Sequence, residues 1–196
     1  MKRFSLAIVV VAAFFLISIV ATSEVSATNL IANGGFETGT FAPDWIAIPA
    51  SSGSLFGVST TDPHSGLYAA YFGATGSSND TIFQFSTSTQ AGQSYVFSFW
   101  LAHPSGTSAN NFTALWNGTP VLNLTNIDQF AYTEYSFVEQ AASAFSTFGF
   151  AAHEVPAFFY LDDVSVSPLS VPEPATLLYL GSGLLGVAMF ARRRKK

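Results

Sequence analysis

The chain has 196 residues, of which 49% are hydrophobic and 10% charged, with a formal net charge of −5 and no cysteine. This length allows one domain with a sizeable core, and the lack of cysteine excludes disulfide bonds as its brace. All seven Lys and Arg residues lie at Lys2, Arg3 and 192–196. The middle of the chain therefore has no base to neutralise phosphates and is not expected to bind nucleic acid.

Residues 1–27 have the pattern of a secretory signal peptide. Lys2 and Arg3 precede an apolar stretch from Phe4 to Ala21, and Val25-Ser26-Ala27 provides small residues at a cleavage site. We expect cleavage after Ala27 and export across the inner membrane. An uncleaved N-terminal anchor is the alternative, and the well-formed cleavage site together with a second apolar segment at the other terminus disfavours it.

Residues 28–167 are expected to form an all-β domain. Short runs with period-2 alternation are separated by Gly, Ser, Asn and Pro, and no long amphipathic helix is found there. In Tyr95–Leu101 the alternate residues form one aromatic face. Further expected strands are Ser54–Val58, Leu67–Phe72, Phe112–Trp116, Pro120–Leu124 and Phe158–Val166. With turns such as Asn117-Gly118 between them, about eight to ten short strands predict an antiparallel jelly-roll β-sandwich.

The charge of this domain is one-sided. Of the twelve acidic residues in the chain, Glu24 and Glu173 lie outside 28–167, which leaves ten acids and no Lys or Arg inside it. The domain should therefore be repelled by anionic polysaccharide as well as by nucleic acid. A buried carboxylate must find N–H donors, hydroxyl groups or a metal cation, because no Lys or Arg partner exists.

Three segments of the domain resemble those of calcium-containing β-sandwich carbohydrate-binding modules of the galactose-binding type. They are Asn29–Glu37, Pro63–Ala69 and Phe159–Val166. The resemblance implies a fold in which the first and last strands lie close together and hold a structural Ca²⁺.

The acidic residues in these segments suit such a metal. By strict alternation, Asp162 shares the face of the two valines that follow it, which is the expected core face. Calcium binds six to eight oxygens, commonly from carboxylates and backbone carbonyls. We expect Glu37 and Asp162 as side-chain ligands, with carbonyls near Gly34 and around His64–Ser65. In the alternative interpretation, both carboxylates only accept backbone hydrogen bonds at strand ends.

Sugar contacts require exposed aromatic faces with a few polar neighbours. Trp45 and Trp116 are the candidates, since each lies beside a polar residue, Asp44 and Asn117 respectively. The alternative is that both tryptophans belong to the core, as most aromatic residues do. Four Asn-x-Thr triplets, which we interpret as polar turn and strand residues, begin at Asn79, Asn111, Asn117 and Asn123.

No catalytic constellation is found, and we expect that the domain is not an enzyme. His64, His103 and His153 are scattered, without a Gly-x-Ser-x-Gly elbow or a His-Glu-x-x-His motif. The acids Glu134, Glu139 and Glu154 could be paired as in a glycosidase, but any acidic sandwich offers such pairs.

The carboxyl end has three parts after a short extended linker at 168–171. Pro172-Glu173-Pro174 is followed by an uncharged run from Ala175 to Ala191 and then by the basic residues Arg192, Arg193, Arg194, Lys195 and Lys196. As a helix the run would span roughly 25 Å, slightly less than a ~30 Å hydrocarbon core. We expect a transmembrane helix whose basic end stays in the cytoplasm.

This order of parts resembles the PEP-CTERM sorting signal of Gram-negative bacteria, over residues 172–196. The resemblance implies processing by an exosortase, transient membrane anchoring, and delivery to the cell surface or to an extracellular matrix such as that of a biofilm. An ordinary single-pass anchor is the alternative. We therefore expect an exported envelope or matrix protein with a structural or interaction role. The alternative function is a lectin-like module for neutral matrix glycans.

Overall fold

The computed structural model describes residues 28–74, 77–86, 88–106, 109–169, 181–183 and 192. The expected signal peptide, the Pro-Glu-Pro triplet and most of the expected transmembrane helix lie outside these residues. Within the described part of the chain, no helix is both long and apolar enough to cross a membrane. The boundaries expected for these terminal segments remain predictions.

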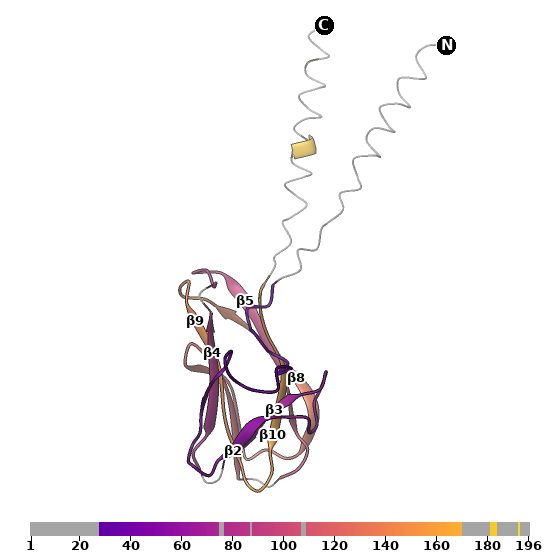
Figure 1. Cartoon of the computed structure of the whole chain (residues 1–196). Helices are drawn as coiled ribbons and strands as arrows, with labels where there is room; N and C mark the ends of the chain where they lie inside the picture. Colours follow the sequence, from indigo (N-terminus) through magenta and orange to yellow (C-terminus); the bar gives the residue numbers. More distant parts are fainter. Residues whose placement is uncertain are drawn as a thin grey trace, which may run out of the picture.

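The described domain is an antiparallel β-sandwich, which confirms the predicted fold class (Figure 1). Its ten strands are β1 (Ile46–Ile48), β2 (Leu55–Ser59), β3 (Ala69–Gly73), β4 (Asp80–Ser86), β5 (Ser94–His103), β6 (Asn110–Trp116), β7 (Thr119–Thr125), β8 (Phe130–Gln140), β9 (Ser146–Glu154) and β10 (Phe159–Pro168). Sheet A has the order β1-β4-β9-β6-β7, and sheet B has the order β2-β3-β10-β5-β8.

Phenylalanines from the two sheets fill the space between them. On sheet B, Phe97, Phe99 and Leu101 of β5 point inward and are fully buried, as the alternation of that segment predicts. Phe99 meets Phe150 of sheet A edge-to-face, with ring centroids 4.9 Å apart and planes at 81°. Such pairs add stability beyond the area they bury, so this contact holds the two sheets together.

The predicted turn at Asn117-Gly118 is present and joins β6 to β7. Asn117 has a φ of 50° and Gly118 a φ of 76°. A tight hairpin turn with two positive φ angles favours Asn-Gly, because these residues enter the left-handed region at low cost. The Asn117 side chain also accepts a 2.8 Å hydrogen bond from the Thr147 N–H, which ties this hairpin to β9.

The first described residues run alongside the last strand. Leu30 donates a backbone hydrogen bond to Val166 (2.7 Å), and Val164 donates one to Gly34 (2.9 Å). This proximity agrees with the one that the carbohydrate-binding-module resemblance implies. As a result, both ends of the described domain lie at the same end of the sandwich (Figure 1).

A β-bulge in β10 changes the predicted orientation of Asp162. The register with β5 shifts between Asp162 and Ser165, and Asp163 has a φ of 49°. Asp162 pairs with Trp100, which lies on the outer face of sheet B, while Val164 returns to the core. The prediction that Asp162 shares the valine face was therefore wrong, because the bulge breaks the alternation between them.

Candidate functional site

Asp162 is fully buried although it lies on the outer face of sheet B, because the loop that contains His64 and Ser65 covers it. Its Oδ2 accepts hydrogen bonds from the backbone N–H groups of His64 (2.9 Å) and Ser65 (3.1 Å), and its Oδ1 accepts one from Asp163 (2.7 Å). Burial raises the pKa of the Asp162 carboxyl, and these N–H donors oppose the rise.

Asp163 holds the same loop through side chains. Its Oδ2 lies 2.7 Å from His64 Nδ1, and its Oδ1 accepts a 2.7 Å hydrogen bond from the Ser65 hydroxyl. The His64 ring also stacks on Trp100 of β5, with centroids 3.9 Å apart. These contacts fix the loop on β10 and β5.

Glu37 holds the other end of this loop. Its carboxylate accepts hydrogen bonds from the N–H groups of Leu67 (3.0 and 3.1 Å) and Tyr68 (3.2 Å). Gly66, with a φ of 63°, lies so close that an added Cβ would stand 2.1 Å from Glu37 Oε1. Only glycine fits this position without a shift of the carboxylate.

The structure brings the expected metal ligands to one place. A Cβ added at Gly35 would lie 3.8 Å from Asp162 Oδ1 and 3.7 Å from Glu37 Cγ. However, each oxygen of both carboxylates already accepts at least one N–H hydrogen bond, and the Gly34 carbonyl accepts that of Val164. Among the described residues, no three His, Asp or Glu side chains are grouped closely enough to hold a metal ion. These contacts are the ones expected if Glu37 and Asp162 only accept backbone hydrogen bonds. A calcium ion at this place would have to share the same carboxylate oxygens with the N–H donors.

Both tryptophans predicted to contact sugar are buried instead. Trp45 is 2% exposed, and its indole N–H donates to the Asn33 carbonyl at 3.1 Å. Trp116 is 4% exposed and packs on Phe148, with centroids 4.9 Å apart. Neither indole face is open to a ligand, so the prediction that these tryptophans contact sugar was wrong, and the alternative, that both belong to the core, holds.

The three histidines lie in separate places. His64 is in the loop over sheet B, and His153 is on the outer face of sheet A, where its Nδ1 contacts Asn79. His103 is buried beside Glu154, with Nε2 and Oε2 3.1 Å apart.

The outer face of sheet A carries a row of linked amides that sequence reasoning missed. Asn79 donates to Asn111 Oδ1 (2.9 Å), and Asn111 donates to Asn123 Oδ1 (2.9 Å). The hydroxyl groups of Thr113 and Thr125 join the same network. We call these five residues the amide ladder. All five belong to three Asn-x-Thr triplets, and the Asn and Thr of a triplet share a face because residues two apart in a strand point the same way.

The other end of the same face carries two exposed aromatic rings. Phe85 of β4 and Phe145 in the loop before β9 are 52% and 49% exposed, and they stack with centroids 5.7 Å apart and planes at 29°. By the rise per residue of a strand, Phe85 lies roughly 20 Å from Asn79. Between them, the central strand β9 presents only the small residues Gly149 and Ala151. Amide groups and an aromatic platform therefore share one elongated face.

Comparison with known proteins identifies the motif at the carboxyl end and the fold of the domain. The family model of the PEP-CTERM protein-sorting motif matches residues 170–195. A search of curated proteins finds no match.

Among solved structures, TmCBM61 in complex with β-1,4-galactotriose matches with a TM-score of 0.56, at 17% identity over 73% of this chain and 100% of that one. A family 16 carbohydrate-binding module matches with a TM-score of 0.52, at 18% identity over 70% and 99%. The active domain of the bacteriophage CBA120 tailspike protein 4 has a TM-score of 0.56 at 12% identity, and the match covers 72% of this chain and 21% of the tailspike chain. The chain thus carries a PEP-CTERM sorting motif behind a β-sandwich with the fold of carbohydrate-binding modules.

Proposed function

We propose that this protein is sorted by an exosortase to the cell surface or extracellular matrix, where its sandwich binds neutral polysaccharide through the outer face of sheet A. The sorting half of the proposal is supported by the match at residues 170–195. The binding half rests on the amide ladder and the exposed pair Phe85 and Phe145 on one face.

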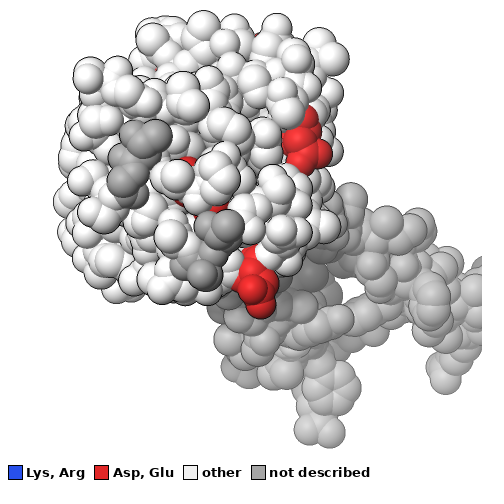
Figure 2. Space-filling view, turned by 90° about the horizontal axis from the view of Figure 1, so that it is seen from below, with Lys and Arg blue, Asp and Glu red and all other residues white. Residues whose placement is uncertain are grey.

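The charge of the domain indicates which polysaccharide it would bind. Residues 28–167 contain no Lys or Arg, and the end of the domain seen in Figure 2 shows scattered Asp and Glu with no basic residue among the described ones. Anionic polymers would be repelled. Amide groups can donate to and accept from sugar hydroxyls, and aromatic rings can stack on the apolar faces of sugars. Neutral glycans of the matrix are therefore the proposed ligands.

A pull-down of the full-length protein in detergent micelles tests the binding half, with insoluble galactan and xylan as neutral probes. Replacing Phe85 and Phe145 together by Ala should weaken binding about tenfold, and so should Asn111→Ala at the centre of the ladder. Val138→Ala is the matched control, because Val138 is 60% exposed on the opposite sheet. Binding that is unaffected by the phenylalanine and Asn111 substitutions would move the site elsewhere.

We also propose that a calcium ion can be held at Glu37 and Asp162, with carbonyl oxygens near Gly34 and Ser65 as further ligands. Support comes from the proximity of the two carboxylates around Gly35 and from the absence of Lys and Arg partners for them. Such an ion would have a structural role, joining the first described segment to β10.

A further inference from the structure

A second aromatic surface lies on the outer face of sheet B. Tyr71 of β3 and Tyr160 of β10 are directly paired, and Tyr160 pairs on its other side with Ala102 of β5. Tyr132 of β8 follows, with its hydroxyl group near Asp62. We call Tyr71, Tyr160 and Tyr132 the tyrosine row. It crosses the sheet at right angles to the strands, and all three residues are half-buried.

Glycines make room for the rings at one end of this row. A Cβ added at Gly57 would stand 3.0 Å from Tyr71 Oη and 3.2 Å from its Cζ, so the outer half of the ring lies over this glycine. Gly73 is covered in the same way by Phe158, which packs edge-to-face on Tyr71 at 5.5 Å. Glycine weakens a strand interior and often marks the close approach of another group. Here that group is an aromatic ring held close to the sheet.

The hydroxyl groups of Tyr132 and Tyr160 in this row keep their protons. Tyr132 Oη donates a 2.7 Å hydrogen bond to the Asp62 carbonyl. Burial raises the pKa of Tyr132, as do the charges of Asp162 and Asp62. Burial also raises the pKa of Tyr160, with further contributions from Asp62 and Tyr71. Tyr132 and Tyr160 therefore present uncharged phenols at physiological pH.

One side of the row is bordered by fixed side chains. The centroid of the His64 ring lies 5.0 Å from that of the Tyr132 ring. His64 in turn stacks on Trp100, and its Nδ1 contacts the Asp163 carboxylate. Tyr132 therefore packs against a ring that β5 and β10 hold in place. This end of the row needs little ordering of side chains when a ligand binds, which favours affinity.

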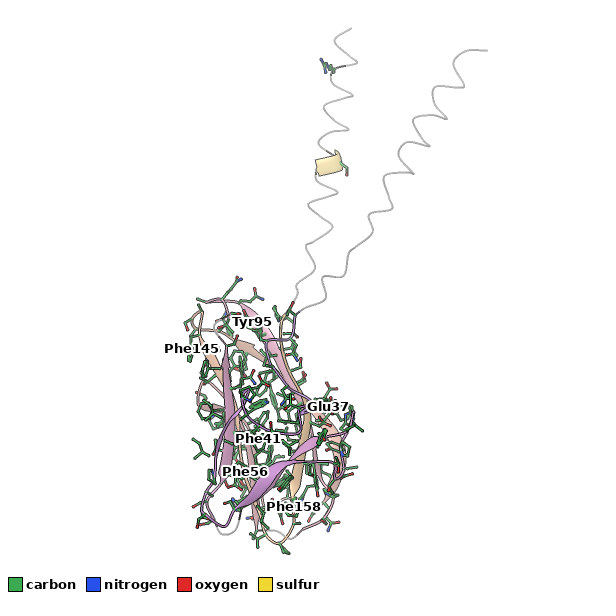
Figure 3. The ribbon with its side chains drawn as sticks, viewed as in Figure 1. Glu37, Phe41, Phe56, Tyr95, Phe145 and Phe158 are labelled. Atoms are coloured by element: carbon green, nitrogen blue, oxygen red, sulfur yellow. The ribbon has the colours of Figure 1, made fainter. Side chains whose placement is uncertain are left out.

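We propose that the tyrosine row is a second glycan-binding surface, so that one sandwich can hold two neutral polysaccharide chains on opposite sides. The surface offers flat rings and the phenol groups of Tyr71 and Tyr160, and residues 28–167 contain no Lys or Arg, which suits an uncharged sugar and disfavours an anionic one. Figure 3 shows Phe145 near the upper end of the domain and Phe158, which packs on Tyr71, near its lower end. The inference rests on the proposed function, because both faces would bind the same class of ligand.

Three variants of the full-length protein in detergent test this proposal. The first carries Phe85→Ala, Phe145→Ala and Asn111→Ala on sheet A. The second carries Tyr71→Ala and Tyr160→Ala on sheet B. The third carries Tyr71→Phe and Tyr160→Phe, which keep the rings and serve as a folding control. Binding to insoluble xylan is measured together with bridging, which is the retention of soluble fluorescent xylan on xylan beads through the protein.

Each single-face Ala variant should still bind xylan but with about tenfold lower affinity, and neither should bridge. The Phe variant should bind and bridge with a smaller loss.

Full binding and bridging by the Tyr71→Ala, Tyr160→Ala protein would overturn the inference and leave the proposed function intact. Bridging that survives in both single-face variants would also overturn the inference, because several modules in one micelle would then explain the bridging. Failure of the wild-type protein to bind any neutral polysaccharide would refute both proposals.

Discussion

The imidazole ring of His64 lies flat on the indole ring of Trp100, with centroids 3.9 Å apart and planes inclined by only 15°. The same imidazole contacts the Asp163 carboxylate at 2.7 Å. A residue from a loop is thus held at once by β5 and by β10. This relationship explains how Asp162 can be fully buried on the outer face of a sheet.

His64→Ala should lower the free energy of unfolding by about 1 kcal/mol, because it removes both the ring stack and the contact with Asp163. His64→Phe separates the two contributions, since it keeps a ring over Trp100 and removes only the polar contact. Urea unfolding of the three proteins measures the difference. Equal stability of wild type and His64→Ala would show that the loop is held by its backbone hydrogen bonds alone.

Gly66→Ala should be more harmful than a glycine substitution at an ordinary loop position. It introduces a Cβ that would stand 2.1 Å from Glu37 Oε1, at a residue with a φ of 63°. Gly92→Ala is the matched control, because Gly92 has a φ of 82° but nothing within 4 Å of an added Cβ. We expect Gly92→Ala to cost about 1 kcal/mol and Gly66→Ala clearly more. Equal unfolding midpoints for the two variants would contradict the close contact with Glu37.

Calcium should raise the Tm of the protein, and a chelator should lower it, if Glu37 and Asp162 hold the ion. Binding to the folded state alone stabilises by about 2.7 kcal/mol at a hundredfold excess over Kd. Asp162→Asn should abolish the calcium-dependent change, whereas Asp128→Asn, at an exposed position outside this cluster, should keep it. A Tm that is the same with calcium and with chelator would leave the two carboxylates as hydrogen-bond acceptors only.

Tail processing can be read from a single digestion, since no Lys or Arg lies between Arg3 and Arg192. An intact tail loses residues 193–196 to trypsin, even after denaturation, so its mass falls. A mature protein from which an exosortase has removed the tail contains no trypsin site, so its mass should not change. Protein from a host without the exosortase is the control. A trypsin-dependent loss of mass in the normal host would refute removal of the tail.

Alkaline pH should destabilise the fold through Tyr132. Its pKa is raised above the ordinary value of 10.0, so above that pH the unfolded chain releases this proton while the folded protein retains it. The folded state then binds more protons, and stability falls as the pH rises above about 10. Tyr132→Phe should flatten this part of the pH–stability curve, as measured by urea unfolding at stepwise increasing pH. A curve of the same slope in this variant would assign the effect to other groups.

The elements that could be predicted are those that depend on local pattern. The aromatic alternation of Tyr95–Leu101 predicted a buried face, and Asn117-Gly118 predicted a hairpin turn. The bulge after Asp162 could not be predicted in this way, because a positive φ at an aspartate leaves no mark in a pattern of polar and apolar residues.

The candidate sites depended on information that the linear sequence does not carry. The Asn-x-Thr triplets were visible, but Asn79, Asn111 and Asn123 meet only because strand order places β4, β9, β6 and β7 side by side. The burial of Trp116 likewise follows from which side of β6 faces the other sheet, and that of Trp45 from how the segment before β1 packs on the core. Strand order and facing are properties of the whole fold, so local periodicity alone could not provide them.

The position of β10 has a mechanical consequence. This strand leads directly into residues 170–195, and it is the central strand of sheet B, hydrogen-bonded to β3 on one side and to β5 on the other. A pull on the carboxyl end acts along the strand axis, so the hydrogen bonds on both sides resist it together in shear and do not unzip one at a time. A module tethered through this strand should withstand drag from a moving polymer better than one tethered through an edge strand such as β2 or β8.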